Sequence, residues 1–284
     1  MRFQVSHVTK HHYNRPVFLE PHTIRLSPRA DPFQRVLGFT IDVTPRPTQL
    51  AAVLDPQGNS IHHAWFEDLT ESLTVRVHFE VETLLKNPFG YLLTDERYGR
   101  LPLEYAPEIE TLVAMYRGAA PGSAGAVGDF ARSIAGEAHH GTIPWLTTLN
   151  QRIYEISEVE IREDGDPQPA EQTLATRTGA CRDLTVLFME CCRSLGLAAR
   201  FVSGYQEGDE DTDRRYMHAW AEVYLPGGGW RGFDPTHGIA VADRHVAVAA
   251  GPTPATAAPI SGSFRGTGAL ARMEADLQMR VTEG

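Results

Sequence analysis

Apolar and polar residues alternate strictly over residues 73–81, which read LTVRVHFEV. A period of two places the apolar side chains on one face of a strand and the polar side chains on the other. Another extended segment begins at Phe3, and residues 55–59 read DPQGN, which includes the proline and glycine typical of a tight turn. The pattern predicts an N-terminal antiparallel β-domain over residues 1–100.

The spacing of the apolar residues changes after residue 100. Segments 108–117 and 145–156 repeat apolar side chains every three or four residues, as does the segment through Phe130 and Ile134. A Gly- and Ala-rich stretch at 118–125 lies between segment 108–117 and the segment through Phe130, and it indicates a junction. We therefore expect a second domain over residues 101–284, including the strands at the C-terminus.

The clearest helical pattern of this second domain covers about residues 181–195. Its apolar stripe consists of Leu184, Leu187, Phe188, Cys191 and Leu195. Gly196 follows and ends the helix, because glycine readily adopts the left-handed conformation. Segments 199–205, 218–225 and 230–233 read as strands, with a Pro-Gly-Gly-Gly turn at 226–229. The prediction is an α+β fold in which one helix packs on an antiparallel sheet.

Composition excludes several classes of protein. The chain has 284 residues, 42% of them hydrophobic, and a formal net charge of -10. Nucleic acids and anionic membranes attract clustered Lys and Arg, so neither is an expected partner. The first residues show no apolar run of signal-peptide length, and the chain contains no apolar stretch long enough to span a bilayer. We expect a cytoplasmic protein, and the sequence leaves its oligomeric state open.

Cys181 is the first candidate for chemistry. It follows Gly179 and Ala180 and stands at the start of the predicted helix. The first N–H groups of a helix have no partner within it, and the helix dipole favours negative charge there. This position favours the thiolate, which is the nucleophilic form of cysteine. Cys181 is therefore a candidate nucleophile.

A nucleophilic cysteine requires a base, and His218 begins the predicted strand 218–225. Asp234 ends the partner strand, and the turn at 226–229 folds the two strands together. We expect this hairpin to bring Asp234 close to His218, where a carboxylate orients an imidazole and stabilises its charged form. The prediction is a triad of Cys181, His218 and Asp234.

The remaining thiols and histidines receive simpler interpretations. Cys191 and Cys192 lie on or beside the apolar stripe of the helix, which indicates buried, inert thiols. His237 follows Asp234 closely and is interpreted as a loop residue. Adjacent histidines occur at 11–12, 62–63 and 139–140, but neighbouring strand residues point to opposite faces.

Asp209, Asp211 and Asp213 alternate as calcium ligands do. The segment nevertheless lacks the following glycine and the glutamate that complete a calcium-binding loop. We expect no metal at this segment or at the histidine pairs. No other cofactor is indicated.

Four sequence blocks occur in a fixed order around the candidate triad. They read TGACRDL at 178–184, LGLAARFVSGY at 195–205, HAWAEVY at 218–224 and GWRGFDPT at 229–236. With these blocks the chain resembles the transglutaminase-like superfamily, and within it the bacterial branch named as cysteine proteases. The β-rich start is similar to the N-terminal region of these bacterial proteins. The resemblance implies a papain-like, transglutaminase-like core with Cys181, His218 and Asp234 at the catalytic positions.

The implied reaction is thiol-dependent acyl transfer on the amide bond of a peptide or protein, through a thioester. Hydrolysis by a cysteine peptidase or amidase is the preferred prediction. Transamidation, as in transglutaminases, and a peptide-binding module without catalysis are the alternatives. Tyr205 and Trp220 are candidate walls of the substrate site, with a place in the hydrophobic core as the alternative for each.

Overall fold

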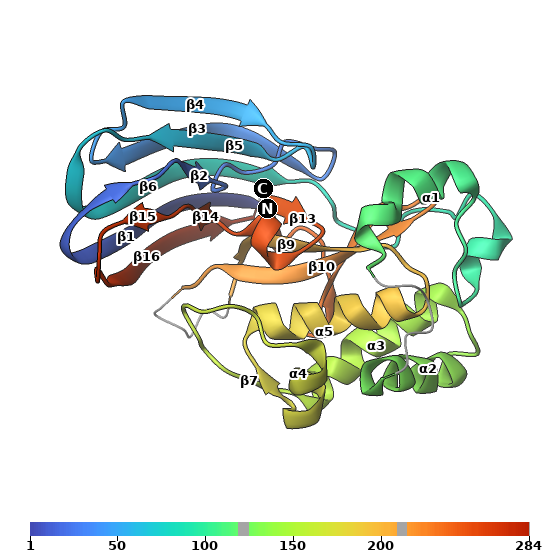
Figure 1. Cartoon of the computed structure of the whole chain (residues 1–284). Helices are drawn as coiled ribbons and strands as arrows, with labels where there is room; N and C mark the ends of the chain where they lie inside the picture. Colours follow the sequence, from blue (N-terminus) through green and yellow to red (C-terminus); the bar gives the residue numbers. More distant parts are fainter. Residues whose placement is uncertain (119–124, 209–214, 284) are drawn as a thin grey trace.

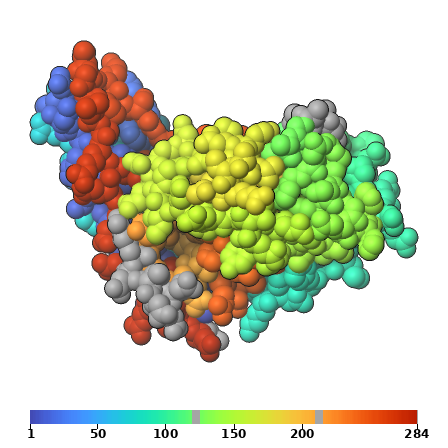
Figure 2. Space-filling view, turned by 90° about the horizontal axis from the view of Figure 1, so that it is seen from below, coloured from blue at the N-terminus to red at the C-terminus, as the bar shows by residue number. Residues whose placement is uncertain are grey.

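The computed structural model describes residues 1–118, 125–208 and 215–283, and these form two lobes (Figure 1). One lobe is rich in strands and contains segments from both ends of the chain. In the other lobe, helices cover one face of a sheet. Seen from below, N-terminal segments in blue and C-terminal segments in red lie side by side, and the green and yellow helical region forms the other part of the surface (Figure 2).

The β-rich lobe contains two antiparallel sheets. The first has the order β15(Phe264–Arg265), β1(Arg2–Leu19), β6(Leu69–Thr83), β3(Gln34–Thr44), and β16(Ala271–Thr282) also pairs with β1. The second has the order β14(Ile260–Ser261), β2(His22–Ile24), β5(Ser60–Trp65), β4(Gln49–Leu54).

Alternation explains the core of this lobe. In β6, Leu73, Val75 and Val77 are fully buried, whereas the intervening Arg76 and His78 are exposed. The turn predicted at 55–59 joins β4 to β5, and Gly58 has the positive φ of 74° that favours glycine. The predicted N-terminal β-rich region is therefore confirmed.

The C-terminal strands differ from the expectation. We expected them to accompany the second domain, but β16 pairs with β1 along residues 2–13, and β14 and β15 also join the sheets of the β-rich lobe. This lobe therefore consists of residues from both ends of the chain. The pairing joins segments more than 200 residues apart, which no local pattern specifies.

The second lobe has one antiparallel sheet and a helical layer. The sheet order is β12(Ile239–Ala240), β11(Gly229–Asp234), β10(His218–Leu225), β9(Ala199–Gln206), β13(His245–Gly251). The helices are α1(Pro107–Val113), α2(Ala126–Glu137), α3(Thr142–Ile156), α4(Ala170–Thr176) and α5(Cys181–Ser194). Short elements complete the lobe: 3₁₀ turns η1(Glu96–Gly99), η2(Ala114–Tyr116) and η3(Pro254–Ala257), and the parallel pair β7(Glu158–Val159) and β8(Thr178–Gly179).

Helix α5 lies between the sheet and helices α2, α3 and α4 (Figure 1). Its predicted stripe is buried, with Leu184, Leu187 and Phe188 fully inaccessible to solvent. Gly196 has a φ of 86°, so the predicted end of the helix is confirmed. The helix packs against β9 and β10, as expected for a helix carrying Cys181 on an antiparallel sheet.

The two lobes share a packed junction. Tyr205 of β9 and Val246 and Val248 of β13 belong to the hydrophobic core of the β-rich lobe. The Tyr205 hydroxyl also lies 2.9 Å from Nδ1 of His7, which is on β1. Strand β13, at the edge of the sheet in the second lobe, is therefore packed against the β-rich lobe.

Candidate active site

Cys181 is the first residue of α5 and is partly buried. Its side chain lies close enough to the ring of His218 to raise the pKa of that imidazole. The first N–H groups of a helix lack partners within it, so the N–H of Cys181 is placed to bind a negatively charged group beside the sulfur. The N–H of Asp183 instead donates to the Ala180 carbonyl at 2.8 Å. The structure therefore places the thiol at a helix N-terminus, as predicted.

The hairpin of β10 and β11 brings His218 to Asp234. Ala221 pairs with Phe233, and this register carries the first residue of β10 to the last residue of β11. His218 Nε2 lies 2.8 Å from Asp234 Oδ2. Since Nε2 is engaged by the carboxylate, Nδ1 is the ring nitrogen left for Cys181. The three predicted residues are thus connected in the order thiol, imidazole, carboxylate.

Charge explains the protonation of this group. Burial alone would lower the pKa of His218, but the Asp234 carboxylate outweighs it and, with Cys181, raises the pKa to about 10. Burial opposes ionisation of Asp234 as well, yet His218 and the other donors hold the pKa of this carboxyl well below its usual range. Near neutral pH, the pair is an imidazolium next to a carboxylate.

A second carboxylate organises the start of α5. Asp183 is fully buried, and its Oδ2 accepts the backbone N–H of Ala180 at 2.7 Å. Its Oδ1 accepts a side-chain N–H of Arg162 and the backbone N–H of Gln168, both at 2.8 Å. Asp183 therefore caps the helix and also fastens the loop at residues 162–168 beside Cys181.

Two further histidines contact the same carboxylate, and sequence reasoning missed this role for both. His237 Nδ1 lies 2.8 Å and His245 Nε2 lies 3.0 Å from Asp234 Oδ2. His237 lies in the loop after β11 as interpreted, and its closeness in sequence to Asp234 was the available signal. His245 begins β13, and no local pattern links it to Asp234.

Tyr205 and Trp220 require a correction. Tyr205 is fully buried at the junction of the lobes, and Trp220 is only 1% exposed. Trp220 packs behind the site, with its ring centroid 6.3 Å from that of His218. Neither side chain is open to a substrate in this structure, so we assign both to packing, the alternative that the sequence had offered.

Cys191 and Cys192 are fully buried, and burial raises the pKa of both thiols. This environment favours the neutral, unreactive form and supports the prediction of inert thiols. Cys181 differs because it is partly accessible and contacts an imidazole.

The histidine and aspartate cluster has the residue types of a metal site. Candidate ligand atoms of His218, Asp234 and His245 lie within 4.8 Å of one another. Hydrogen bonds between both histidines and Asp234 account for this geometry. The candidate calcium ligands Asp209 and Asp213, with the aspartate between them, lie outside the described residues. The absence of a metal stays a prediction.

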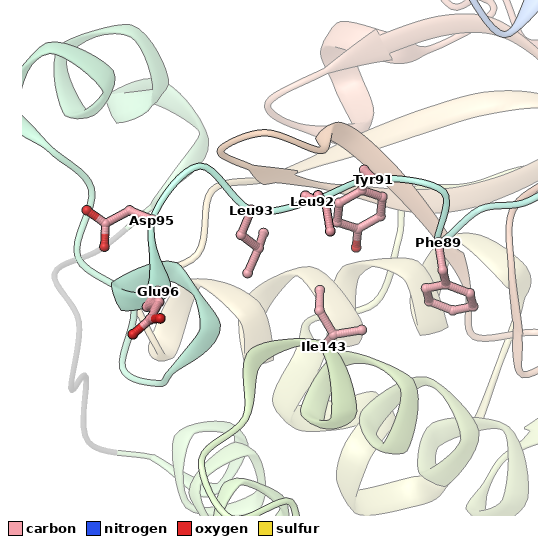
Figure 3. Close-up of a pocket in the computed structure, with 7 residues that line it drawn as sticks. All are labelled: Phe89, Tyr91, Leu92, Leu93, Asp95, Glu96 and Ile143. Atoms are coloured by element: carbon pink, nitrogen blue, oxygen red, sulfur yellow. The ribbon is translucent and has the colours of Figure 1, made fainter.

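A pocket of 440 Å³ lies between the segment at residues 89–96 and the start of α3 (Figure 3). Its walls are mainly apolar and consist of Phe89, Tyr91, Leu92, Leu93, Asp95, Glu96 and Ile143. None of the three predicted catalytic residues lines it. The pocket is thus separate from the group around Cys181.

Among the residues described, no helix combines the length and apolar character that crossing a membrane requires. The cytoplasmic location and the expected partners stay predictions.

Known proteins share this arrangement of the chain. Residues 3–82 match the bacterial transglutaminase-like N-terminal region, and residues 129–235 match the transglutaminase-like superfamily. A crystal structure from Cytophaga hutchinsonii, named "Putative Cysteine Protease", superposes with a TM-score of 0.69 and 21% identity, covering 100% of this chain and 92% of that chain. At this identity the similarity concerns the fold.

Relatives cover different shares of the chain. An uncharacterized protein of Mycobacterium tuberculosis is 25% identical over 284 residues, or 92% of this chain and 87% of that protein. One of Mycobacterium leprae is 30% identical over 109 residues, or 37% of each. A protein-glutamine gamma-glutamyltransferase of Pseudomonas aeruginosa is 35% identical over 72 residues, or 23% of this chain and 11% of that protein. The chain therefore belongs to the transglutaminase-like superfamily and carries the bacterial transglutaminase-like N-terminal region.

Proposed function

We propose that the chain is a cysteine peptidase or amidase that hydrolyses an amide bond of a peptide or protein. One observation carries the proposal: the His218 ring contacts the Cys181 side chain and binds Asp234 through Nε2 at 2.8 Å. A thiol at a helix N-terminus beside an imidazolium is an activated nucleophile, and the buried carboxylate orients its base.

In the first half of the proposed reaction, Cys181 Sγ, as the thiolate whose proton is held by His218, attacks the carbonyl carbon of the substrate. The negative charge that develops on the carbonyl oxygen is stabilised by the backbone N–H of Cys181 at the start of α5. His218 then gives its proton to the leaving amine, and the carbon–nitrogen bond breaks. The products of this half-reaction are a free amine and a thioester on Cys181.

In the second half, neutral His218 takes a proton from water, and the resulting hydroxide attacks the thioester carbonyl. The carbon–sulfur bond breaks, a carboxylic acid leaves, and the proton remains on the imidazolium beside the thiolate. Asp234 keeps His218 in one orientation during both halves. The enzyme returns to its starting state without a cofactor.

Transamidation is the second candidate function. The similarity to a protein-glutamine gamma-glutamyltransferase over 72 residues favours it. The first half-reaction would be the same, and a primary amine would replace water in the second half. The third alternative, a module that binds peptide without turnover, is disfavoured by the grouping of the Cys181 thiol, the His218 imidazole and the Asp234 carboxylate.

Incubation with a peptide library, with and without a primary amine, tests the proposal by mass spectrometry. Hydrolysis adds one water across a cleaved amide, whereas transamidation replaces ammonia or a leaving amine by the added amine. Cys181→Ala should abolish either product, while Cys191→Ala, on the same helix, serves as the matched control. Binding of peptides with no product from the wild type would favour the binding module and contradict the proposal.

A further inference from the structure

One oxygen of the Asp234 carboxylate is surrounded by three imidazole nitrogens. Oδ2 lies 2.8 Å from Nε2 of His218 and 2.8 Å from Nδ1 of His237. It also lies 3.0 Å from Nε2 of His245. The other oxygen, Oδ1, accepts the backbone N–H of Thr236 at 3.0 Å. A triad carboxylate requires a single imidazole partner, so the other two need an explanation.

His237 and His245 differ in their access to water. The side chain of His237 is 38% exposed, so a water molecule is able to replace it at the carboxylate. The side chain of His245 is 1% exposed. Its backbone pairs with Gln206 of β9, which fixes its place in the sheet. Among the two, His245 is the partner that solvent cannot substitute.

The surroundings of His245 also define its tautomer. Burial lowers the pKa of His245, more strongly than Asp234 raises it, so the ring is neutral near pH 7. A carboxylate only accepts hydrogen bonds, so Nε2 must carry the proton. Nδ1 is buried and has no hydrogen-bond partner among the described residues. His245 thus donates its one N–H to Asp234.

The ring of His245 is held in place by packing. The Trp220 ring meets it edge to face, with centroids 5.2 Å apart and an angle of 72° between the planes. Trp220 is itself 1% exposed and also packs beside His218. One buried aromatic ring therefore restrains both imidazoles that bind the carboxylate.

We propose that His245 is a positioning residue that holds the Asp234 carboxylate in line with His218. Asp234 ends β11 and His245 begins β13, and the sheet order places β10 and β9 between these strands. Thr236 and His237 hold the carboxylate from the loop directly after β11, and His245 adds a restraint from a different strand. The inference rests on the proposed function, in which Asp234 orients the base of Cys181.

A neutral donor suits this role. A second imidazolium at Asp234 would repel the positive charge on His218 and compete for the same carboxylate. The neutral His245 ring supplies a hydrogen bond without that charge. This accounts for a histidine that keeps its only N–H on Asp234, with its other nitrogen unpartnered within residues 1–118, 125–208 and 215–283.

Two substitutions separate the hydrogen bond of His245 from its volume. His245→Gln places an amide N–H near the position of Nε2, and His245→Leu fills a similar volume without a donor. We measure the rate of Cys181 alkylation by iodoacetamide near pH 7 and the pKa of His218 by ¹⁵N NMR titration. His245→Leu should slow alkylation roughly 10- to 100-fold, as expected for loss of one charge-assisted hydrogen bond.

The pKa of His218 should fall below about 10 in His245→Leu, because a misaligned carboxylate stabilises the imidazolium less. His245→Gln should stay close to the wild type in both measurements. Substitution of the exposed His12 by Leu is the matched control and should change neither. An unchanged or raised pKa of His218 in His245→Leu would overturn the proposal, since His245 would then only pack or only draw charge from Asp234.

If His245→Leu fails to fold, His245→Asn replaces it. The Asn amide lies near the position of Nδ1 and does not reach Asp234, so equal behaviour of the Asn and Gln variants would overturn the positioning role. Failure of the proposed function would give a different result. In that case, Cys181 would be alkylated in His218→Ala as fast as in the wild type.

Discussion

Two buried histidines, in two regions of the molecule, are driven to opposite charge states. At the candidate active site, His218 faces the Asp234 carboxylate at 2.8 Å, and its pKa is raised to about 10 despite burial. At the junction of the lobes, His7 faces the neutral hydroxyl of Tyr205 at 2.9 Å, and burial lowers its pKa to about 4.

The difference shows that burial alone does not decide the charge of an imidazole. A buried ion is costly unless an opposite charge and hydrogen bonds compensate for its lost hydration. At the junction, a neutral histidine completes a hydrogen bond between two lobes. At the candidate active site, the carboxylate retains a charged imidazole beside the Cys181 sulfur, and the proposed chemistry requires this charged imidazole.

The largest effect is expected from Asp234→Asn, which removes the charge that distinguishes His218 from His7. Without the carboxylate, only Cys181 opposes the effect of burial on His218, so the pKa of His218 should fall well below about 10. Hydrolysis should fall on the order of 10³- to 10⁴-fold, as for other triads whose carboxylate is replaced by an amide. Rate measurement on a cleaved peptide checks this, with the exposed Asp129→Asn as the control. Retained activity in Asp234→Asn would exclude the triad.

The second prediction concerns His7 at the junction of the lobes, which should make the folded protein less stable in acid. Because the pKa of His7 is lower in the folded state, its stabilising contribution is complete above about pH 6.5 and is lost as the pH falls toward 4. The loss amounts to about 3 kcal/mol. The His7→Gln variant should lack this part of the acid sensitivity in urea unfolding at neutral and acidic pH. Parallel pH profiles for both proteins would show that His7 is not the titrating group.

The third prediction concerns the variant Asp183→Ala, which removes a carboxylate with a structural role, in contrast to the proposed catalytic carboxylate of Asp234. Arg162, Gln168 and Ala180 would lose their common acceptor, so the free energy of unfolding should fall by about 2 kcal/mol. Hydrogen exchange of the backbone amides over residues 162–168 should accelerate in the variant. Unchanged exchange there would mean that Asp183 does not fasten the loop.

The smallest effects are expected at the other end of the same helix. Cys191→Ala and Cys192→Ala should leave the hydrolysis rate unchanged and reduce stability by about 1 kcal/mol each. In the native wild type, iodoacetamide should modify one thiol per chain, and peptide mapping should assign it to Cys181. Modification of all three thiols at similar rates would contradict the distinction between a reactive and two buried cysteines.

Local patterns in the sequence predicted much of the candidate site. The stripe of α5 specified a helix whose first residue is Cys181, and the turn at 226–229 specified the hairpin that joins His218 to Asp234. Both are short-range features, since helix periodicity and hairpin register depend on neighbouring residues. The alternation over 73–81 likewise specified β6.

Contacts between segments far apart in the sequence could be known only from the tertiary structure. Tyr205 has the same residue type whether it lines a cleft or packs between lobes, and the pairing partner of β16 is more than 200 residues away. The sequence contains twelve histidines, and no local pattern distinguishes His245 among them. Only the position of β13 in the fold brings it to 3.0 Å from Asp234. The sequence by itself predicted the candidate thiol, base and carboxylate, because a helical pattern begins at Cys181 and a local hairpin joins His218 to Asp234. Only the fold determined their burial, their charges and the second donor, because these depend on which surfaces are packed together.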